Sequence, residues 1–313
     1  MFPHASLEKF PKDEVALLFR LLKFLLQFIL VIAILTGSVY AYAKYIEPFS
    51  LKENSISVSS PLIGKEADGL TVAVFSDTHF GEFYTVEDFE EVLKSIETAH
   101  PDMVLFLGDL IDHYDRYILS EDTREISRAL AKINAPLGKY AVFGNHDYEG
   151  GAEYAYENIM TAGGFTVLKN QSIQVGDSAL QLVAIDELLV GYGDPAASAQ
   201  ADSHSFTILM CHEPDIIDEI MGEPFQLMLA GHTHGGQIST PFSSVNQAFL
   251  PAKGKKYVKG SYTFQSLEDD GSSRRTDLYV TTGIGMTQLP LRFACRPEVL
   301  TVTLHNGETN VSQ

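Results

Sequence analysis

Hydrophobic residues are distributed unevenly along the 313-residue chain. Residues 24–43 form one continuous run, FLLQFILVIAILTGSVYAYA, that contains no charged side chain. A helix of about 20 residues spans roughly 30 Å, which is the thickness of the hydrocarbon core of a bilayer. The run therefore predicts a transmembrane helix, and a buried core helix is the alternative.

Beyond residue 66, short apolar runs alternate with stretches of helical periodicity. The stretch 86–99, for example, repeats apolar residues at helical spacing. The alternation predicts strands within 69–79, 102–109 and 139–147, and helices within 86–99, 124–133 and 152–164. Such an order is typical of parallel strands joined by right-handed crossovers. Five further apolar runs predict strands within 179–186, 206–214, 225–234, 278–285 and 298–305. These are too many strands for one short sheet, so we expect an α/β fold with two packed sheets flanked by helices.

Between the apolar run and the first strand, residues 44–66 are mixed polar and include Pro48 and Pro61. This composition predicts a tether. The expected organisation is a tail over 1–23, a membrane anchor over 24–43, a linker over 44–66 and one large domain over 67–313.

The formal net charge of −19 argues against nonspecific nucleic-acid binding, which depends on basic residues that neutralise phosphates. The charge is divided unequally, because residues 1–46 carry a net +2 and the remainder carries −21. The two cysteines, Cys211 and Cys295, make no disulfide framework, and we expect them only to pack.

The basic residues Lys9, Lys12, Arg20 and Lys23 precede the apolar run. The positive-inside rule then predicts a single-pass protein of the cell membrane, with a cytoplasmic N-terminus and residues 44–313 outside. The triplet Ala41-Tyr42-Ala43 resembles a signal-peptidase site, so a cleaved signal peptide is the alternative to a retained anchor. In both cases the body of the protein is exported.

Five of the predicted strands are followed by side chains that bind metals. Polar residues just past strand ends lie where open α/β sheets bind their ligands. The combination of carboxylates, a carboxamide and imidazoles suits divalent ions such as Mn, Fe, Co or Zn. Each motif alone is compatible with an ordinary turn, but five together at sheet edges require something charged between them. The motifs are SDTH (Asp77, His79), GDLID (Asp109, Asp112), GNHD (Asn145, His146, Asp147), CHEP (His212) and GHTH (His232, His234).

This ordered set of motifs resembles the calcineurin-like metallophosphoesterase superfamily over roughly residues 70–305. The form GHTHGGQ and the N-terminal anchor are similar to its membrane-associated bacterial branch. Some members of that branch act on phospholipid-like or UDP-diacylglucosamine-type substrates. The resemblance implies an αββα four-layer sandwich of two mixed β-sheets flanked by helices.

The resemblance also implies roles for the residues of the five motifs. Asp77, His79 and His234 would bind one divalent ion, Asn145, His212 and His232 a second, and Asp109 would bridge the two. His146 would be the acid that assists the leaving group, and Asp112 would orient His146. The metals are expected to be Mn, Zn or Fe.

One position departs from the pattern of many phosphoprotein phosphatases in the superfamily. These carry an arginine directly after the last aspartate of the GD-x-x-D motif, whereas this chain has His113. The departure weakens a phosphoprotein phosphatase interpretation and favours a diesterase.

The resulting expectation is a dinuclear metal-dependent phosphoester hydrolase. Two ions about 3.5–4 Å apart share a hydroxide and clamp the phosphoryl oxygens for in-line attack. The expected substrate is a membrane-proximal phosphodiester or pyrophosphate of phospholipid or UDP-lipid type. The alternatives are a phosphomonoesterase or nucleotide hydrolase, and a noncatalytic scaffold with the same fold.

Two segments near the C-terminus lie beside these motifs in the sequence. The basic cluster Lys253, Lys255, Lys256 and Lys259 follows Phe242, Phe249 and Leu250, whose side chains are expected to be exposed. It is either a solvated hairpin or a lip that engages an anionic headgroup. Gly283 and Gly285 are expected either in a tight turn or in the rim of the site.

Overall fold

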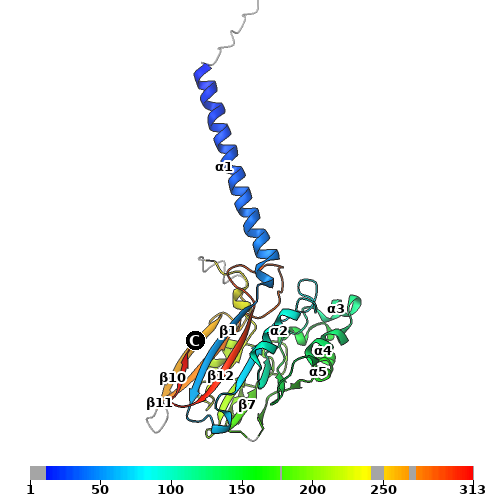
Figure 1. Cartoon of the computed structure of the whole chain (residues 1–313), viewed down its shortest axis with the longest axis vertical. Helices are drawn as coiled ribbons and strands as arrows, with labels where there is room; N and C mark the ends of the chain where they lie inside the picture. The colour runs from blue at the N-terminus through cyan, green and yellow to red at the C-terminus, as the bar shows by residue number, and fades with distance from the viewer. Residues whose placement is uncertain (1–11, 177, 241–249, 268–272, 313) are drawn as a thin grey trace, which may run out of the picture.

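The computed structural model describes residues 12–176, 178–240, 250–267 and 273–312. A single long helix, α1 (Lys12–Tyr45), projects from a domain built around two sheets (Figure 1). Its large apolar side chains are exposed along most of its length, and its 34 residues extend about 50 Å at 1.5 Å per residue. The helix is therefore long and apolar enough to cross a bilayer.

The first sheet has seven strands in the order β13-β1-β12-β2-β3-β4-β5. Neighbours from β2 to β5 are parallel, whereas β12 runs antiparallel to β2. The strands are β1 (Lys52–Ser60), β2 (Thr71–Phe75), β3 (Met103–Phe106), β4 (Lys139–Ala141), β5 (Thr166–Val167), β12 (Glu298–Asn306) and β13 (Asn310–Ser312).

The second sheet has six strands in the order β10-β11-β9-β8-β7-β6. Its inner strands are parallel, and β10 and β6 pair antiparallel at the two edges. The strands are β6 (Gln171–Gln174), β7 (Leu180–Ala184), β8 (Phe206–Met210), β9 (Leu227–Ala230), β10 (Gly260–Leu267) and β11 (Ser273–Val280).

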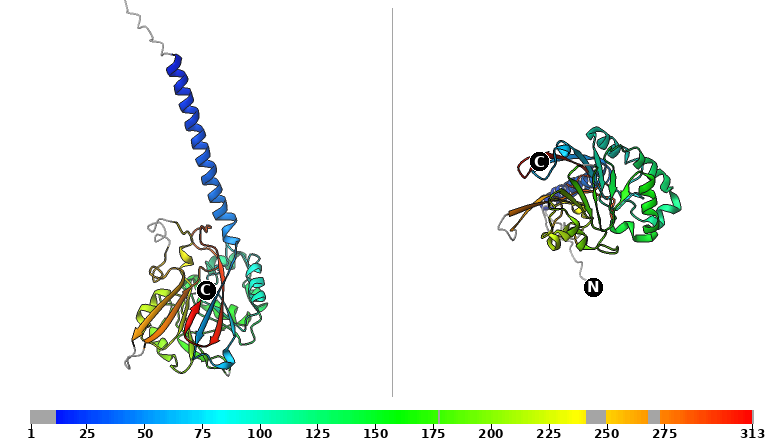
Figure 2. Two further views of the ribbon diagram at one scale, coloured as in Figure 1. Left: turned by 60° about the vertical axis from the view of Figure 1, so that its left-hand side comes forward. Right: turned by 90° about the horizontal axis from the view of Figure 1, so that it is seen from below.

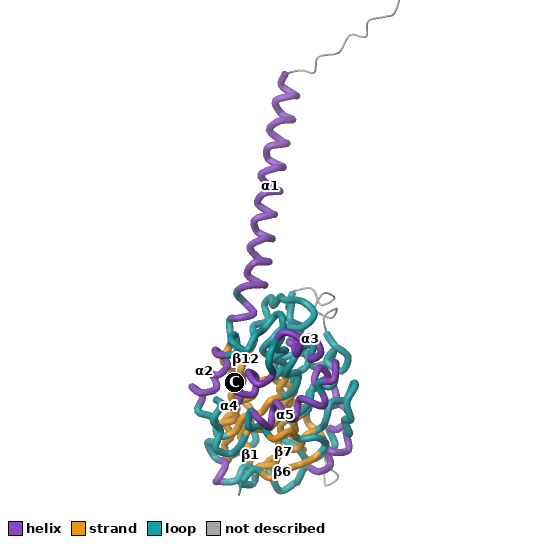
Figure 3. The backbone as a smooth tube through the Cα atoms, turned by 90° about the vertical axis from the view of Figure 1, so that its right-hand side faces the viewer, coloured by secondary structure: helices purple, strands orange, loops and turns teal. Residues whose placement is uncertain are grey.

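Three apolar cores hold the layers together. The core between the sheets contains Leu105 of the first sheet and Ile208 of the second. The outer face of the first sheet packs on α2 (Glu90–Ala99), α4 (Thr123–Ala131) and α5 (Glu153–Ala162), which gather on one side of the domain (Figures 2 and 3). The outer face of the second sheet packs on α6 (Ile217–Ile220) and the 3-10 helix Pro195–Gln200. The four-layer arrangement of two mixed sheets flanked by helices is confirmed.

The expected linker over 44–66 is wrong for most of its length. A 3-10 helix (Glu47–Phe49) follows α1, and β1 then pairs in parallel with β12 from Lys52 opposite Glu298 to Ser60 opposite Asn306. Ile56 and Val58 are buried in the core between the sheets. The folded domain therefore begins where α1 ends. The structure also contains α3 (Tyr114–Ser120), which the apolar pattern did not predict.

Candidate metal centre

The five predicted motifs converge because the strands that precede them are parallel. In each sheet the carboxyl ends of parallel strands meet at one edge, and the loops after β2, β3, β4, β8 and β9 meet there. Many residues of these loops have unusual backbone geometry. Positive φ angles occur at Asp77 (54°), His79 (43°), Asp109 (60°), His232 (70°) and His234 (50°). Each such residue costs of order 1–3 kcal/mol, and conformations of this kind cluster at functional sites.

Two glycines permit the loops to approach one another. A Cβ at Gly144 would overlap the carboxylate and backbone nitrogen of Asp109. A Cβ at Gly231 would overlap the Ser76 hydroxyl and lie 2.6 Å from Asp77 Oδ2. The glycines of GNHD and GHTH are therefore needed for close packing of loops that come from different strands.

One cluster of ligand atoms joins Asp77, His79 and His234. The ligand atoms of these three buried residues lie within 4.8 Å of one another. His234 Nε2 is 3.0 Å from His79 Nε2 and 3.6 Å from Asp77 Oδ1. The structure thus brings together the three residues predicted for the first ion.

A second cluster joins Asp109, His212 and His232, again within 4.8 Å. His212 Nε2 is 3.2 Å from Asp109 Oδ2, and the same oxygen is 3.4 Å from His79 Nε2 in the first cluster. Asp109 therefore lies between the clusters, where a bridging carboxylate would have to be. Asn145 lines the same cavity as Asp109 and His232.

Backbone carbonyls fix the tautomers of two of the imidazoles. His212 Nδ1 lies 2.6 Å from the Leu107 oxygen, and His232 Nε2 lies 2.7 Å from the Ala252 oxygen. A carbonyl accepts only, so both of these nitrogens carry hydrogen. His212 Nε2 and His232 Nδ1 are then left with the lone pairs that bind a metal.

Several buried polar atoms here lack a hydrogen-bond partner among the described residues. They include Asn145 Oδ1, His79 Nδ1 and His212 Nε2. Buried polar groups are nearly always paired, and a site for an ion is one explanation when they are not. The orphaned Asn145 Oδ1, together with the nitrogen and oxygen donors around it, fits a pair of divalent ions.

The charges of the cluster also favour cations. Burial raises the pKa of Asp77, although nearby imidazoles oppose the effect. Burial opposes protonation of His79, yet the carboxylates of Asp109 and Asp112 raise its pKa to about 10. Burial lowers the pKa of His234 well below its usual value, and this keeps the imidazole in the neutral form that binds metal.

His146 lies beside the clusters with its imidazole 15% exposed. Its Nδ1 is 2.6 Å from the backbone oxygen of Asp112 and 3.9 Å from the Asp112 carboxylate. That carboxylate lies nearer to His79, whose Nδ1 is 3.2 Å away. Asp112 therefore contacts His146 through its backbone carbonyl and contacts the predicted metal ligand His79 through its side chain.

Asp147, the last residue of GNHD, has no role predicted from the motif alone. Its buried carboxylate accepts hydrogen bonds from the backbone N–H groups of Asp109, Leu110 and Gly144, at 2.8–2.9 Å. Burial and the neighbouring Asp109 raise the pKa of Asp147 to about 7. Asp147 thus ties the loop after β3 to the loop after β4.

Arg292 was also missed, although it follows Gly283 and Gly285, which were expected either in a tight turn or in the rim of the site. Its side chain is completely buried. The guanidinium donates to the carbonyl oxygens of Thr282, Gly285 and Cys295 and lies 3.4 Å from His234 Nδ1. The burial of Arg292 cannot be predicted from a local pattern, because its acceptors are backbone carbonyl groups that only the folded loop brings together.

Two buried glutamates behind the centre hold another loop in place. The carboxylate of Glu187 accepts hydrogen bonds from the backbone N–H groups of Leu189, Val190 and Gly191. Glu213 Oε1 accepts a weaker one from Leu188. The loop 187–193 is thereby fixed beside the centre.

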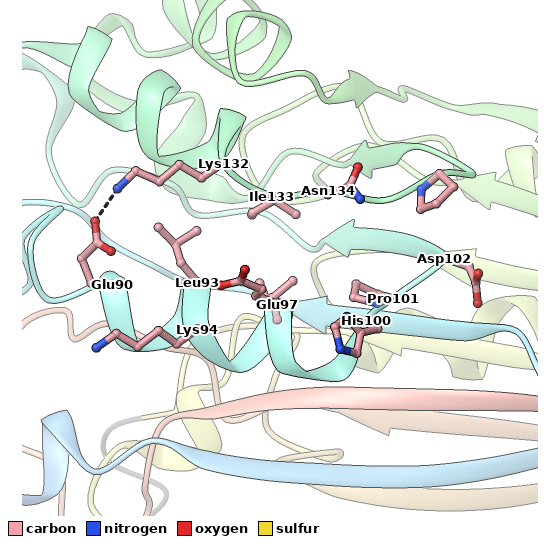
Figure 4. A pocket seen from close by; sticks show the side chains of 12 residues that line it. Glu90, Leu93, Lys94, Glu97, His100, Pro101, Asp102, Lys132, Ile133 and Asn134 are labelled. Atoms are coloured by element: carbon pink, nitrogen blue, oxygen red, sulfur yellow. Dashed lines mark hydrogen bonds and ion pairs between the residues drawn. The ribbon is translucent and has the colours of Figure 1, made fainter.

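The ligand clusters open into a cavity of about 120 Å³. The segment 283–293 contributes to its rim through Thr287, Gln288 and Leu289 rather than through its glycines. The cavity is lined by Asp109, Asn145, His146, Leu189, His232, Thr233, His234, Gln237, Pro251, Thr287, Gln288 and Leu289. Another cavity, of about 510 Å³, lies between α2 and the segment that follows α4, and none of the predicted site residues lines it (Figure 4).

Two of the four lysines in the basic cluster after GHTHGGQ pair with acidic side chains. Lys253 lies 3.4 Å from Glu219, and Lys256 lies 2.7 Å from Asp218. Leu250 is buried, contrary to the expectation of an exposed residue. Phe242 and Phe249 lie outside the described residues. These contacts favour the solvated hairpin over the lipid-binding lip.

Known proteins that resemble this chain are metallophosphoesterases, and the matches cover most of the domain. The sequence profile described as calcineurin-like phosphoesterase matches residues 70–236. An uncharacterized metallophosphoesterase of Bacillus subtilis, YkuE, is 37% identical, and the match covers 87% of this chain and 92% of that protein. Phosphodiesterase YaeI of Escherichia coli is 29% identical over 87% of this chain and 94% of its own length. UDP-2,3-diacylglucosamine pyrophosphatase LpxG of Chlamydia muridarum is 22% identical, covering 83% of this chain and 91% of LpxG.

Proposed function

Because the chain belongs to the calcineurin-like phosphoesterases, enzymes with a dinuclear divalent metal centre, we propose that it hydrolyses a phosphodiester or pyrophosphate bond at a membrane surface. The observation that carries the proposal is the pair of adjoining ligand clusters beside the end of an apolar helix. The names of two relatives, a phosphodiesterase and a lipid pyrophosphatase, support the reaction class.

The two ions are assigned to the two clusters. Asp77, His79 and His234 would hold one ion, Asn145, His212 and His232 would hold the other, and Asp109 would contact both. Nitrogen and oxygen donors without a thiolate suit Mn, Zn or Fe. When bound, such ions lower the pKa of a water molecule and neutralise phosphoryl oxygens.

The chain itself supplies the proton for the leaving group. His146 Nδ1 donates to the Asp112 carbonyl, so in the doubly protonated imidazolium the Nε2–H is the group that would give its proton to a departing oxygen in the cavity, leaving the neutral imidazole. Leu189 and Leu289, each more than a third exposed, give the cavity mouth an apolar side. A phosphoester with an apolar substituent matches this mixed surface.

The centre lies close to the end of α1. The backbone N–H of Arg292 donates to the Ala43 oxygen at 2.9 Å, and the guanidinium of the same residue reaches His234. One residue therefore connects the membrane-proximal turn of the helix with a predicted metal ligand. A substrate held at the bilayer surface would be near the cavity, whereas a soluble protein substrate would gain nothing from this placement.

The proposal is tested by hydrolysis of bis-p-nitrophenyl phosphate and p-nitrophenyl phosphate by the full chain in detergent micelles, with Mn²⁺, Zn²⁺ or chelator. We expect metal-dependent cleavage that favours the diester. A preference for the monoester would support the phosphomonoesterase alternative. Failure to cleave a panel of diesters, phospholipids and nucleoside diphosphate lipids, with two ions bound, would support the scaffold.

We further propose that the N-terminal tail is cytoplasmic and that the domain is outside, with the helix retained. The basic residues that precede the apolar run support this orientation. Protease added to intact cells should remove the domain and leave a membrane-embedded N-terminal fragment. A domain that is digested only after lysis would reverse the orientation.

A further inference from the structure

A short segment, residues 292–296, lies between the end of α1 and the GHTHGG loop that carries His234. We call this segment the strap. On one side it contacts Ala43 and Glu47, and on the other it contacts His234 and Gly235. The strap therefore touches both the anchor and the metal centre.

The contacts on the anchor side are buried and specific. Glu47 is 2% exposed, and its Oε1 accepts the Cys295 backbone N–H at 2.5 Å. Arg296 extends the attachment, because its guanidinium donates to the carbonyl oxygens of Ser50 and Leu51 at 2.7 Å. With the Arg292–Ala43 bond, these contacts fix the strap to residues 43–51.

The contacts on the metal side reach the loop of His234 directly. The Cys295 thiol donates to the carbonyl oxygen of His234 at 3.2 Å, and a Cβ at Gly235 would lie only 2.6 Å from Cys295 Sγ. The Arg292 guanidinium lies against the His234 ring. The backbone of Phe293 also pairs with Gln237, donating to its oxygen at 3.0 Å.

The His234 loop needs such support. His234 has a positive φ angle of 50°, which is unfavourable for a residue other than glycine and persists only when its surroundings enforce it. The strap packs directly against this loop through Cys295, and Glu47 in turn accepts a hydrogen bond from the backbone of Cys295. Metal ligands depend on groups of this kind for their orientation.

We propose that Glu47 is a positioning residue for the first metal site, so that the anchor end of the chain is part of the scaffold of the centre and more than a tether. Glu47 holds Cys295, and the strap holds His234 in reach of Asp77 and His79. This inference rests on the proposed role of His234 as a metal ligand. It predicts that a substitution of Glu47 weakens the binding of the first ion, whereas the ligands of the second ion stay in place.

The test compares Glu47→Ala, Glu47→Gln and the control Glu53→Ala in the full chain in detergent. Glu53 is an exposed glutamate of β1 that lies only six residues away. Each variant is loaded with Co²⁺, and the stoichiometry, the visible absorption spectrum and the kcat and KM for bis-p-nitrophenyl phosphate are measured. The glutamine oxygen can still accept the Cys295 N–H, so Glu47→Gln should rescue what Glu47→Ala loses.

We expect Glu47→Ala to bind one ion about 10–100-fold more weakly, as for other residues that orient metal ligands, with a changed spectrum and a lower kcat. Glu53→Ala and Glu47→Gln should match the wild type. A Glu47→Ala protein with a lower melting temperature but unchanged ion affinity, spectrum and kcat would overturn the proposal, because Glu47 would then only stabilise the fold.

Cys295→Ala provides a milder variant if Glu47→Ala does not fold. It keeps the backbone contact with Glu47 and removes only the thiol that donates to His234, so the same ion should be weakened to a smaller degree. Unchanged ion binding in this variant would then overturn the proposal. A wild-type chain that binds no ions would instead refute the proposed function on which this inference depends.

Discussion

His146 lines the cavity and differs from the four histidines predicted to bind metal because its imidazole is partly exposed, whereas theirs are buried. We expect His146→Ala to retain both ions and to lower kcat by about 10²–10⁴-fold, the usual contribution of general acid catalysis. Metal content and steady-state kinetics test this expectation. His204→Ala is the control, because His204 is an exposed histidine that pairs with Asp202 on a distant loop. Near-normal turnover in the metal-replete His146→Ala protein would remove His146 from the mechanism.

Gly231 follows β9 of the second sheet and packs against Ser76 and Asp77, which follow β2 of the first sheet. We expect Gly231→Ala to destabilise the protein by about 1–3 kcal/mol, because the new methyl overlaps Ser76 and Asp77 in a packed interior. The affinity for metal should also fall, because the new methyl group displaces the Asp77 carboxylate. Gly222→Ala is the control, because a Cβ there meets nothing within 4 Å. Denaturant unfolding of the two variants compares them, and equal midpoints would refute the packing argument.

At the scale of elements, Lys139 at the start of β4 joins the ends of α4 and α5. Its buried ammonium donates to the carbonyl oxygens of Leu130, Ile133 and Gly163, at 2.9, 3.1 and 2.6 Å. Lys139→Met would leave these acceptors without their donor, so we expect the free energy of unfolding to fall by about 1–3 kcal/mol. Activity per folded molecule should be unchanged, since Lys139 is remote from the cavity.

Lys132→Met is the matched control for Lys139. Lys132 is exposed and pairs with Glu90, and exposed ion pairs contribute about 0–1 kcal/mol. Urea unfolding should therefore separate the two methionine variants. If both variants unfold at the same urea concentration, the capping role of Lys139 is wrong.

At the scale of the whole molecule, the metal centre should contribute to stability. Asp77 and Asp109 are buried near each other, and the charge of Asp109 raises the pKa of Asp77. An ion that binds only the folded state adds about 2.7 kcal/mol at 100 times its dissociation constant. We expect the melting temperature to rise with Mn²⁺ and to fall with chelator.

Asp109→Asn identifies the source of that stabilisation. Asp109 lies between both clusters, so this variant should lose most of the response to Mn²⁺. A wild-type protein whose melting temperature is the same with Mn²⁺ and with chelator would contradict the placement of two tightly bound ions in the domain.

Most strands of the two sheets could be predicted from the sequence. They are continuous apolar runs, which can be recognised without knowing the neighbouring strand. The apolar pattern missed β1, which offers only Ile56 and Val58 in a polar stretch. The partner of β1 is β12, which lies more than 200 residues further along the chain. A polar strand of this kind is stabilised by a pairing that no local window contains.

What the sequence by itself determined was the order of the chemical groups: an apolar helix, parallel strands, and side chains of metal-ligand type after the strand ends. These features are local, because strand and ligand are neighbours in the chain. Tertiary structure alone decided that Asp112 contacts His79 with its side chain and that Asp147 ties two loops together. It also decided that Arg292 of the strap reaches His234 and that Glu47 holds the strap at Cys295. Their burial and partners come from segments far apart in sequence, and only the folded chain brings those segments into contact.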